Sequence, residues 1–228
     1  MRLRRGRHRM PETFSAVIFD LDGTLIDSKD VMRSAYFAAY TEVVGDGTPP
    51  PFSEYCRYLG QSFPNIMRQM GLPLEMHAAF KRESIRNMHR VRVFDGVVAM
   101  LEALSLRRVP MAIATGKDHA RTVALLEHLR VDRYFAMVLG SDDVPNQKPA
   151  PDMALCIADA LALTPADTLF VGDAAADLEC GARAGMKTAL ALWDHPPAHV
   201  LAMPADVRLA VPADLLSLLR IPLSCALS

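Results

Sequence analysis

The run AVIFDLDGTL, residues 16–25, joins four apolar residues directly to a turn that carries two aspartates. A short apolar run that ends in a polar turn is typical of a buried parallel strand. Asp20 and Asp22 would then sit at one strand end, where a carboxylate can attack phosphorus and a second can exchange protons. Gly23 would let backbone N–H groups turn toward phosphate oxygens. An ordinary Asx turn explains the same residues, so the choice between a catalytic turn and a structural one depends on the rest of the chain.

Four further apolar runs end in the same way, and helix-spaced leucines and alanines lie between them. The runs span residues 111–114, 137–139, 168–171 and 188–191. This alternation predicts the α/β class, a doubly wound parallel sheet. Ligands of such sheets bind beyond the carboxyl ends of the strands, so one crevice should collect the polar residues found there.

Two of these polar positions suit a phosphoryl group. Thr115 and Gly116 follow the second run and offer a hydroxyl and open amides at a helix N-terminus. Lys148 stands in the rigid segment Lys-Pro-Ala-Pro-Asp and would supply fixed positive charge. Taken singly, the first pair also fits a helix cap and the lysine a solvated surface residue.

Asp173 and Asp177 follow the run 168–171 and are four positions apart. At the start of a helix they would share one face, where hard carboxylate ligands suit Mg²⁺. A negative phosphate among four aspartates also requires a cation. Asp177 alone would equally well complement a helix N-terminus.

Residues 28–93 interrupt the alternation, because they show helical spacing and no convincing strand. Some 65 residues exceed an ordinary crossover, which predicts an inserted helical cap. We therefore expect three parts: a flexible basic arm over 1–13, a core over 14–27 and 94–228, and the cap over 28–93.

The composition is typical of one globular protein with an adequate core. Of 228 residues, 51% are hydrophobic and 22% charged, with a formal net charge of −1. This balance favours neither nucleic acid nor a membrane surface as a partner, and no run approaches the roughly 20 apolar residues of a membrane helix. The four scattered cysteines form no CxxC pair, so we expect reduced thiols and a cytoplasmic location.

In order and spacing these segments resemble the haloacid dehalogenase (HAD) superfamily of aspartyl phosphotransferases. Its four motifs correspond here to residues 20–25, Thr115, residues 148–152 and residues 172–177. The resemblance implies a Rossmann-like core and a set of roles. Asp20 would be the nucleophile and Asp22 the acid/base; Thr115 and Lys148 would bind phosphate; Asp20, the Asp22 carbonyl and Asp173 would ligate Mg²⁺, with Asp177 in support.

The insert resembles the helical cap of the phosphoglycolate phosphatase and β-phosphoglucomutase branch, which implies hinge strands at residues 27–29 and 93–96. Asp95 replaces the branch's hinge proline. Asp22 argues against a dehalogenase. The mutases carry Gly-x-Ser-Arg in the cap, whereas Phe63 stands here in place of the arginine, so a phosphatase is favoured over a mutase. A non-catalytic regulator with this fold remains an alternative.

The cap should select the substrate, expected to be a small polar phosphate ester. Candidate contacts are Arg57, Gln61, Phe63 and Arg68, although solvated or packed side chains would explain each equally well. Residues 58–67 and 70–76 also resemble the phosphatases of 3-amino-5-hydroxybenzoate (AHBA) biosynthesis in ansamycin-type antibiotic pathways. That resemblance implies that the substrate is a phosphate of an amino sugar or of the aminoshikimate route. A monomer or a homodimer fits the sequence equally well.

Overall fold

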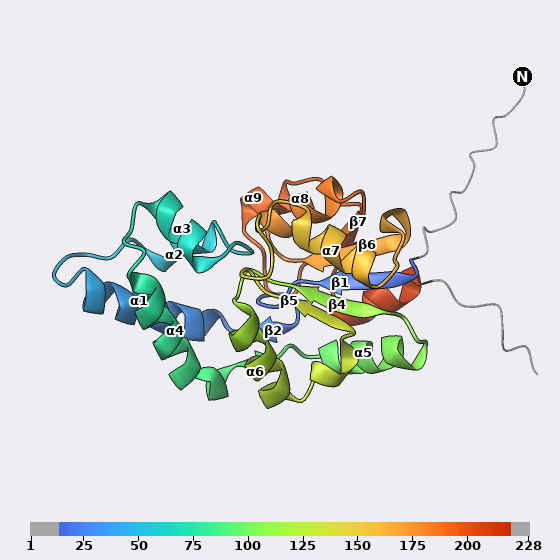
Figure 1. Cartoon of the computed structure of the whole chain (residues 1–228), viewed down its shortest axis with the longest axis horizontal. Helices are drawn as coiled ribbons and strands as arrows, with labels where there is room; N and C mark the ends of the chain where they lie inside the picture. Colours follow the sequence, from blue (N-terminus) through green and yellow to red (C-terminus); the bar gives the residue numbers. More distant parts are fainter. Residues whose placement is uncertain (1–13, 220–228) are drawn as a thin grey trace, which may run out of the picture.

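A six-stranded, fully parallel sheet organises the computed structural model, which describes residues 14–219 (Figure 1). The strand order is β5-β4-β1-β6-β7-β8. The strands are β1 (Ala16–Phe19), β4 (Met111–Ala114), β5 (Met137–Leu139), β6 (Thr168–Gly172), β7 (Lys187–Ala191) and β8 (Val207–Leu209). The predicted doubly wound α/β sheet is thus confirmed. The edge strand β8 was not predicted, because its three residues include the exposed Arg208 and form no apolar run.

Helices cover both faces of the sheet because alternate strand residues point to opposite sides. In β1, Val17 and Phe19 pack into one cluster, whereas Ile18 packs into the other. The first cluster includes α5 (Val97–Leu106), α6 (His119–Leu129) and η4 (Pro212–Leu218). The second includes α7 (Asp152–Ala160) and α8 (Ala175–Arg183), on the opposite face in Figure 1. The short elements η2 (Asp132–Tyr134), η3 (Pro165–Asp167) and α9 (Ala198–Leu201) complete this part.

Most of the segment between β1 and β4, up to α5, forms a helical insert beside the carboxyl ends of the strands (Figure 1). Its elements are α1 (Lys29–Val43), α2 (Phe52–Cys56), α3 (Phe63–Met70), α4 (Met76–Arg86) and η1 (Met88–Arg90). These helices enclose a separate apolar cluster that includes six buried aromatic side chains: Tyr36, Tyr40, Phe52, Tyr55, Phe63 and Phe80.

A two-stranded antiparallel ribbon connects the insert to the sheet. It pairs β2 (Ile26–Asp27) with β3 (Arg92–Val93), so both strands lie earlier than the predicted residues 27–29 and 93–96. Ser28 is the N-cap residue of α1, and Gly96, with φ of +83°, is the N-cap residue of α5. These residues therefore begin helices and do not extend the ribbon. The predicted arm, residues 1–13, lies outside the described residues. Across residues 14–219, no helix is both long and apolar enough to cross a membrane.

Candidate active site

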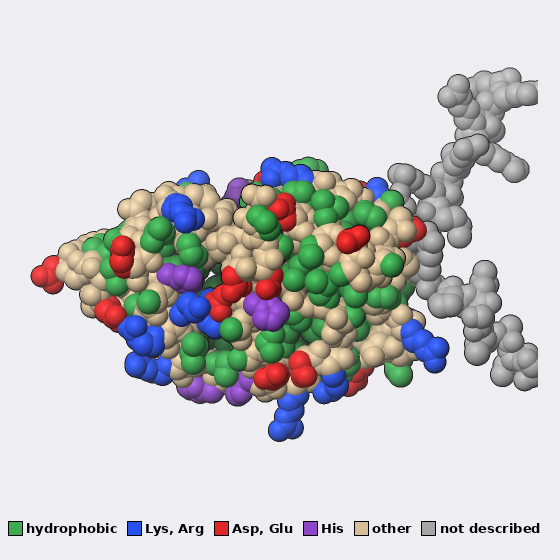
Figure 2. All heavy atoms as spheres, in the orientation of Figure 1, with side chains coloured by type: hydrophobic (Ala, Val, Ile, Leu, Met, Phe, Trp, Pro, Cys, Tyr) green, Lys and Arg blue, Asp and Glu red, His purple; other side chains and the backbone are tan. Residues whose placement is uncertain are grey.

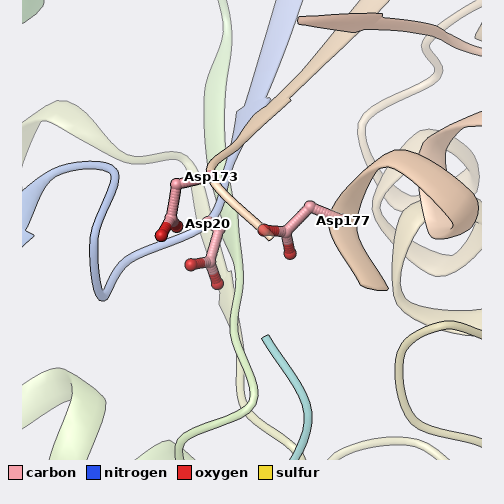
Figure 3. A group of neighbouring side chains, drawn as sticks. All are labelled: Asp20, Asp173 and Asp177. Atoms are coloured by element: carbon pink, nitrogen blue, oxygen red, sulfur yellow. The ribbon is translucent and has the colours of Figure 1, made fainter. Parts of the chain in front are cut away.

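The carboxyl ends of β1 and β6 bring three aspartates together. Asp20 follows β1, Asp173 follows β6 and Asp177 lies in the first turn of α8 (Figure 3). All three are buried, and each offers a carboxylate oxygen within 4.8 Å of the others. The parallel topology explains the meeting, because β1 and β6 are hydrogen-bonded neighbours in register.

Lys148 is the cation within this group, and its side chain is fully buried. Its Nζ donates to Asp20 Oδ1 at 2.7 Å, to Asp177 Oδ1 at 2.6 Å and to the Ala114 carbonyl at 2.9 Å. Burial alone would favour the neutral amine, but Asp177 and Asp20 outweigh it and raise the pKa of Lys148. The lysine therefore stays charged and holds Asp20 in one orientation.

One lysine does not balance three carboxylates. Burial, and then the charge of Asp177, raise the pKa of Asp20 to about 7 despite the opposing effect of Lys148. Burial likewise raises the pKa of Asp173 well above its usual value, with Asp177 and Asp20 adding to the effect. A divalent cation would favour the ionised forms, and buried carboxylate oxygens are the ligands that Mg²⁺ prefers. The donor set thus fits Mg²⁺, which Asp20 and Asp173 would hold.

Asp22 has different surroundings from these three carboxylates. Its Oδ1 accepts a hydrogen bond from the Ser28 hydroxyl, and its Oδ2 lies 3.0 Å from Lys117 Nζ. Although burial acts in the other direction, Lys117 and then Ser28 lower the pKa of Asp22. The two aspartates of the first motif therefore differ: Asp20 belongs to the buried cluster, whereas the side chain of Asp22 is paired with a lysine outside it.

The turn after β1 brings Gly23 against Asp173. Gly23 has φ of +84°, and a Cβ at this position would overlap the Asp173 carboxylate. Thr24 Oγ1 donates to Asp173 Oδ1 at 3.1 Å, and Trp193 Nε1 donates to the Thr24 carbonyl at 2.9 Å. The glycine therefore permits a close approach that fixes Asp173 beside Asp20.

Thr115 and Gly116 lie at the end of β4, where the insert meets the sheet. Thr115 is buried, and its Oγ1 accepts a hydrogen bond from the Lys117 amide at 3.3 Å. A Cβ at Gly116 would overlap the carbonyl oxygen of Gln61, so only glycine lets the insert lie this close. Ser62 also donates to Gln147 of the sheet part. The insert is thus closed over the strand ends.

A cavity of about 40 Å³ remains between the insert and the strand ends. This volume holds only a few water-sized groups. Of the predicted residues it brings together six: Asp20, Asp22, Thr115, Gly116, Gln61 and Phe63. Lys148, Asp173 and Asp177 lie buried behind this wall. In Figure 2 the surface is hollowed between the insert and the sheet part, with charged side chains of both signs around the hollow.

Two predicted substrate contacts lie elsewhere. Arg57 is exposed and lines a second, smaller pocket beside Asp173 and α9. Arg68 lies on the exposed face of α3, where its Nη1 donates to Asn65 at 2.7 Å. Periodicity alone could not say which face of a cap helix would meet the sheet.

Seven cavity-lining residues were not predicted as site residues: Met32, Tyr55, Leu59, Gly60, Phe80, Lys117 and Arg121. Lys117 directly follows the expected phosphate seat, a signal that could have identified it. Arg121 lies in the first turn of α6, four residues after Lys117. Met32, Tyr55 and Phe80 come from three separate insert helices, and only tertiary packing shows that they line one wall.

A family model described as haloacid dehalogenase-like hydrolase matches residues 17–191. The chain therefore belongs to this family. It is 29% identical over 207 residues to a phosphoglycolate phosphatase of Aquifex aeolicus, covering 89% of this chain and 95% of that protein. It is 28% identical over 200 residues to the phosphoglycolate phosphatase of Escherichia coli strain K12, covering 76% and 79%.

The structure of a hydrolase from Pseudomonas syringae superposes with a TM-score of 0.79 at 25% identity. The match covers 89% of this chain and 96% of that one. Family, relatives and fold together make the chain a phosphatase of the haloacid dehalogenase type.

Proposed function

We propose that the chain is a Mg²⁺-dependent phosphatase that cleaves a small phosphomonoester through an aspartyl-phosphate intermediate. One observation carries the proposal: Asp20 lines the cavity while also belonging to the buried carboxylate cluster and accepting from Lys148. A side chain placed in this way can reach a substrate and is already oriented for attack.

In the proposed first step, Lys148 holds Asp20 Oδ1 and leaves Oδ2 to attack phosphorus. A bond forms between Oδ2 and phosphorus, the ester P–O bond breaks, and Asp22 donates its proton to the leaving oxygen. Because the pair with Lys117 favours ionised Asp22, that pair has to open, and a phosphoryl group competing for Lys117 would open it. Thr115 and the Gly116 amide donate to the phosphoryl oxygens.

In the second step, water attacks the aspartyl phosphate and Asp22 takes its proton. Phosphate leaves, and Asp20 returns as a carboxylate. Mg²⁺, when bound by Asp20, the Asp22 carbonyl and Asp173, would neutralise phosphoryl charge. Asp177 holds Lys148 and caps α8 through the Ala174 amide at 3.0 Å. The insert excludes water from the closed site, which is the role of a cap.

The substrate class follows from the size of the cavity and from the relatives. A space of about 40 Å³ with the insert closed favours a short ester over a bulky one, and the curated relatives named above are phosphoglycolate phosphatases. We therefore propose a phosphoglycolate-type substrate. An AHBA-route phosphate, a sugar-phosphate mutase activity and a non-catalytic role are alternatives that the same experiment separates.

The test is phosphate release from a panel of phosphomonoesters by the wild type, Asp20→Asn and Asp30→Asn. Asp30 is an exposed carboxylate on α1 and serves as the matched control. Each protein is assayed with Mg²⁺ and with excess chelator. We expect Asp20→Asn to lower turnover by roughly 10⁴-fold or more, as loss of a nucleophile does. The chelator should abolish turnover in the wild type, and Asp30→Asn should match it.

Equal rates in wild type and Asp20→Asn would contradict the nucleophile, and full activity in chelator would contradict the metal. Preference for an amino-sugar or shikimate-type phosphate would favour the AHBA alternative. Isomerisation of a sugar phosphate without net phosphate release would favour a mutase. No phosphate release from any ester of the panel would favour a non-catalytic binding role.

A further inference from the structure

Arg121 contributes a buried guanidinium that the proposed chemistry does not use. Its side chain is only 10% exposed, and it lines both the cavity of Asp20 and a larger adjoining cavity of about 310 Å³. Within residues 14–219, its Nη1 is one of two buried side-chain polar atoms without a hydrogen-bond partner. An unpaired buried donor costs about 1–3 kcal/mol, and more when it is charged. Such a donor in a site wall indicates a group that arrives with the ligand.

The rest of the Arg121 side chain is held in place. Its Nε donates to Asp118, the N-cap residue of α6, and its Cζ lies 5.8 Å from the ring centroid of Phe80. Asp118 cannot neutralise every cation around it, because Lys81 also pairs with it at 3.5 Å. Two cations thus share one carboxylate. An anionic group of a ligand would satisfy the free end of the guanidinium.

We propose that Arg121 is a specificity-determining residue that binds a carboxylate of the substrate. The inference rests on the proposed phosphatase function and names the group that the ester carries besides its phosphate. The planar guanidinium matches a carboxylate, and its Nη1 is the free donor. A planar carboxylate needs less space than a second phosphoryl group, and the walls of the cavity that Arg121 shares with Asp20 include Tyr55, Phe63 and Phe80. The substrate is therefore a short phosphorylated carboxylic acid.

The test compares 2-phosphoglycolate with ethyl phosphate, which lacks the carboxylate. kcat/KM for each is measured with the wild type, Arg121→Met, Arg121→Lys and Arg86→Met. Arg86, exposed on α4 and paired with Glu83, is the control for loss of one arginine charge. We expect Arg121→Met to reduce the ratio of the two kcat/KM values about 30- to 100-fold, the usual effect of losing a charged hydrogen bond. Arg121→Lys should restore part of the ratio, and Arg86→Met should keep it.

A second readout does not depend on turnover. Calorimetry measures binding of both esters to Asp20→Asn and to the Asp20→Asn/Arg121→Met double variant in Mg²⁺. We expect 2-phosphoglycolate to bind the single variant more tightly than ethyl phosphate does, and the double variant to lose this advantage. The inference is overturned if the ratio is near one in wild type, or if Arg121→Met weakens both esters equally. If no ester is hydrolysed but this binding pattern holds, the proposed function fails while the carboxylate site stands.

Discussion

The two sides of the cavity are built from different kinds of side chain. The strand-end side contains a buried ionic network, in which Asp20, Asp177 and the Ala114 carbonyl all accept from Lys148. The insert side is aromatic: the Phe63 and Phe80 rings stack with centroids 4.1 Å apart, and Tyr55 lies 6.1 Å from Phe63. A buried ionic network fails when one partner is lost, whereas an apolar wall tolerates substitutions of similar volume. The comparison therefore separates a side that performs the chemistry from an apolar side that limits the size of the substrate, while Arg121 on α6 of the sheet part would recognise the substrate carboxylate.

Replacing Lys148 with methionine should produce the largest effect on stability. Three buried carboxylates would then face one another without their lysine, so we expect a loss of about 3–5 kcal/mol in chelator. Mg²⁺ should recover part of this loss, because the cation would replace the missing charge. Urea unfolding of wild type and variant, with Mg²⁺ and with chelator, measures both quantities.

Lys187→Met is the matched control. Lys187 pairs with Asp206 at 3.2 Å on the surface, with 35% of its side chain exposed. A pair of this kind contributes at most about 1 kcal/mol. If both variants lost the same stability, or if Mg²⁺ left the Lys148→Met protein unchanged, the strand-end side would not behave as an ionic network that binds a cation.

The strand-end side could be predicted from sequence because its residues follow short apolar runs. The run at 16–19 ends at Asp20, and the run at 168–171 ends at Gly172-Asp173. Because both runs form neighbouring parallel strands, their carboxyl ends lie together at one edge of the sheet. The insert side could not be predicted in this way. Helical spacing showed that residues 28–93 form helices, but the face of each helix that meets the sheet depends on long-range packing. Phe63 faces the cavity and Arg68, five residues later, faces solvent.

Substituting Phe63 with leucine should have an intermediate effect, mainly on selectivity. Leucine keeps the wall apolar but makes it smaller, so we expect a stability loss below about 1.5 kcal/mol. The ratio of kcat/KM for a bulky aryl phosphate to that for ethyl phosphate should rise, since the cavity widens. Phe52→Leu is the control, because Phe52 stacks on Tyr55 within the same cluster but does not line the cavity. An equal change in the ratio for both variants would show that general loosening of the insert, not the cavity wall, sets selectivity.

The smallest effect should come from Arg68→Ala. Arg68 lies on the exposed face of α3, and its hydrogen bond to Asn65 spans a single helical turn. Exposed substitutions of this kind usually change stability by less than about 0.5 kcal/mol, and we expect kcat/KM to change less than about twofold for every ester. Steady-state kinetics over the same panel measures this. A tenfold loss would mean that α3 turns this face toward the substrate during turnover. The cavity would then have its apolar wall only when the insert is closed. Substrate selection would also depend on a second arrangement of the insert.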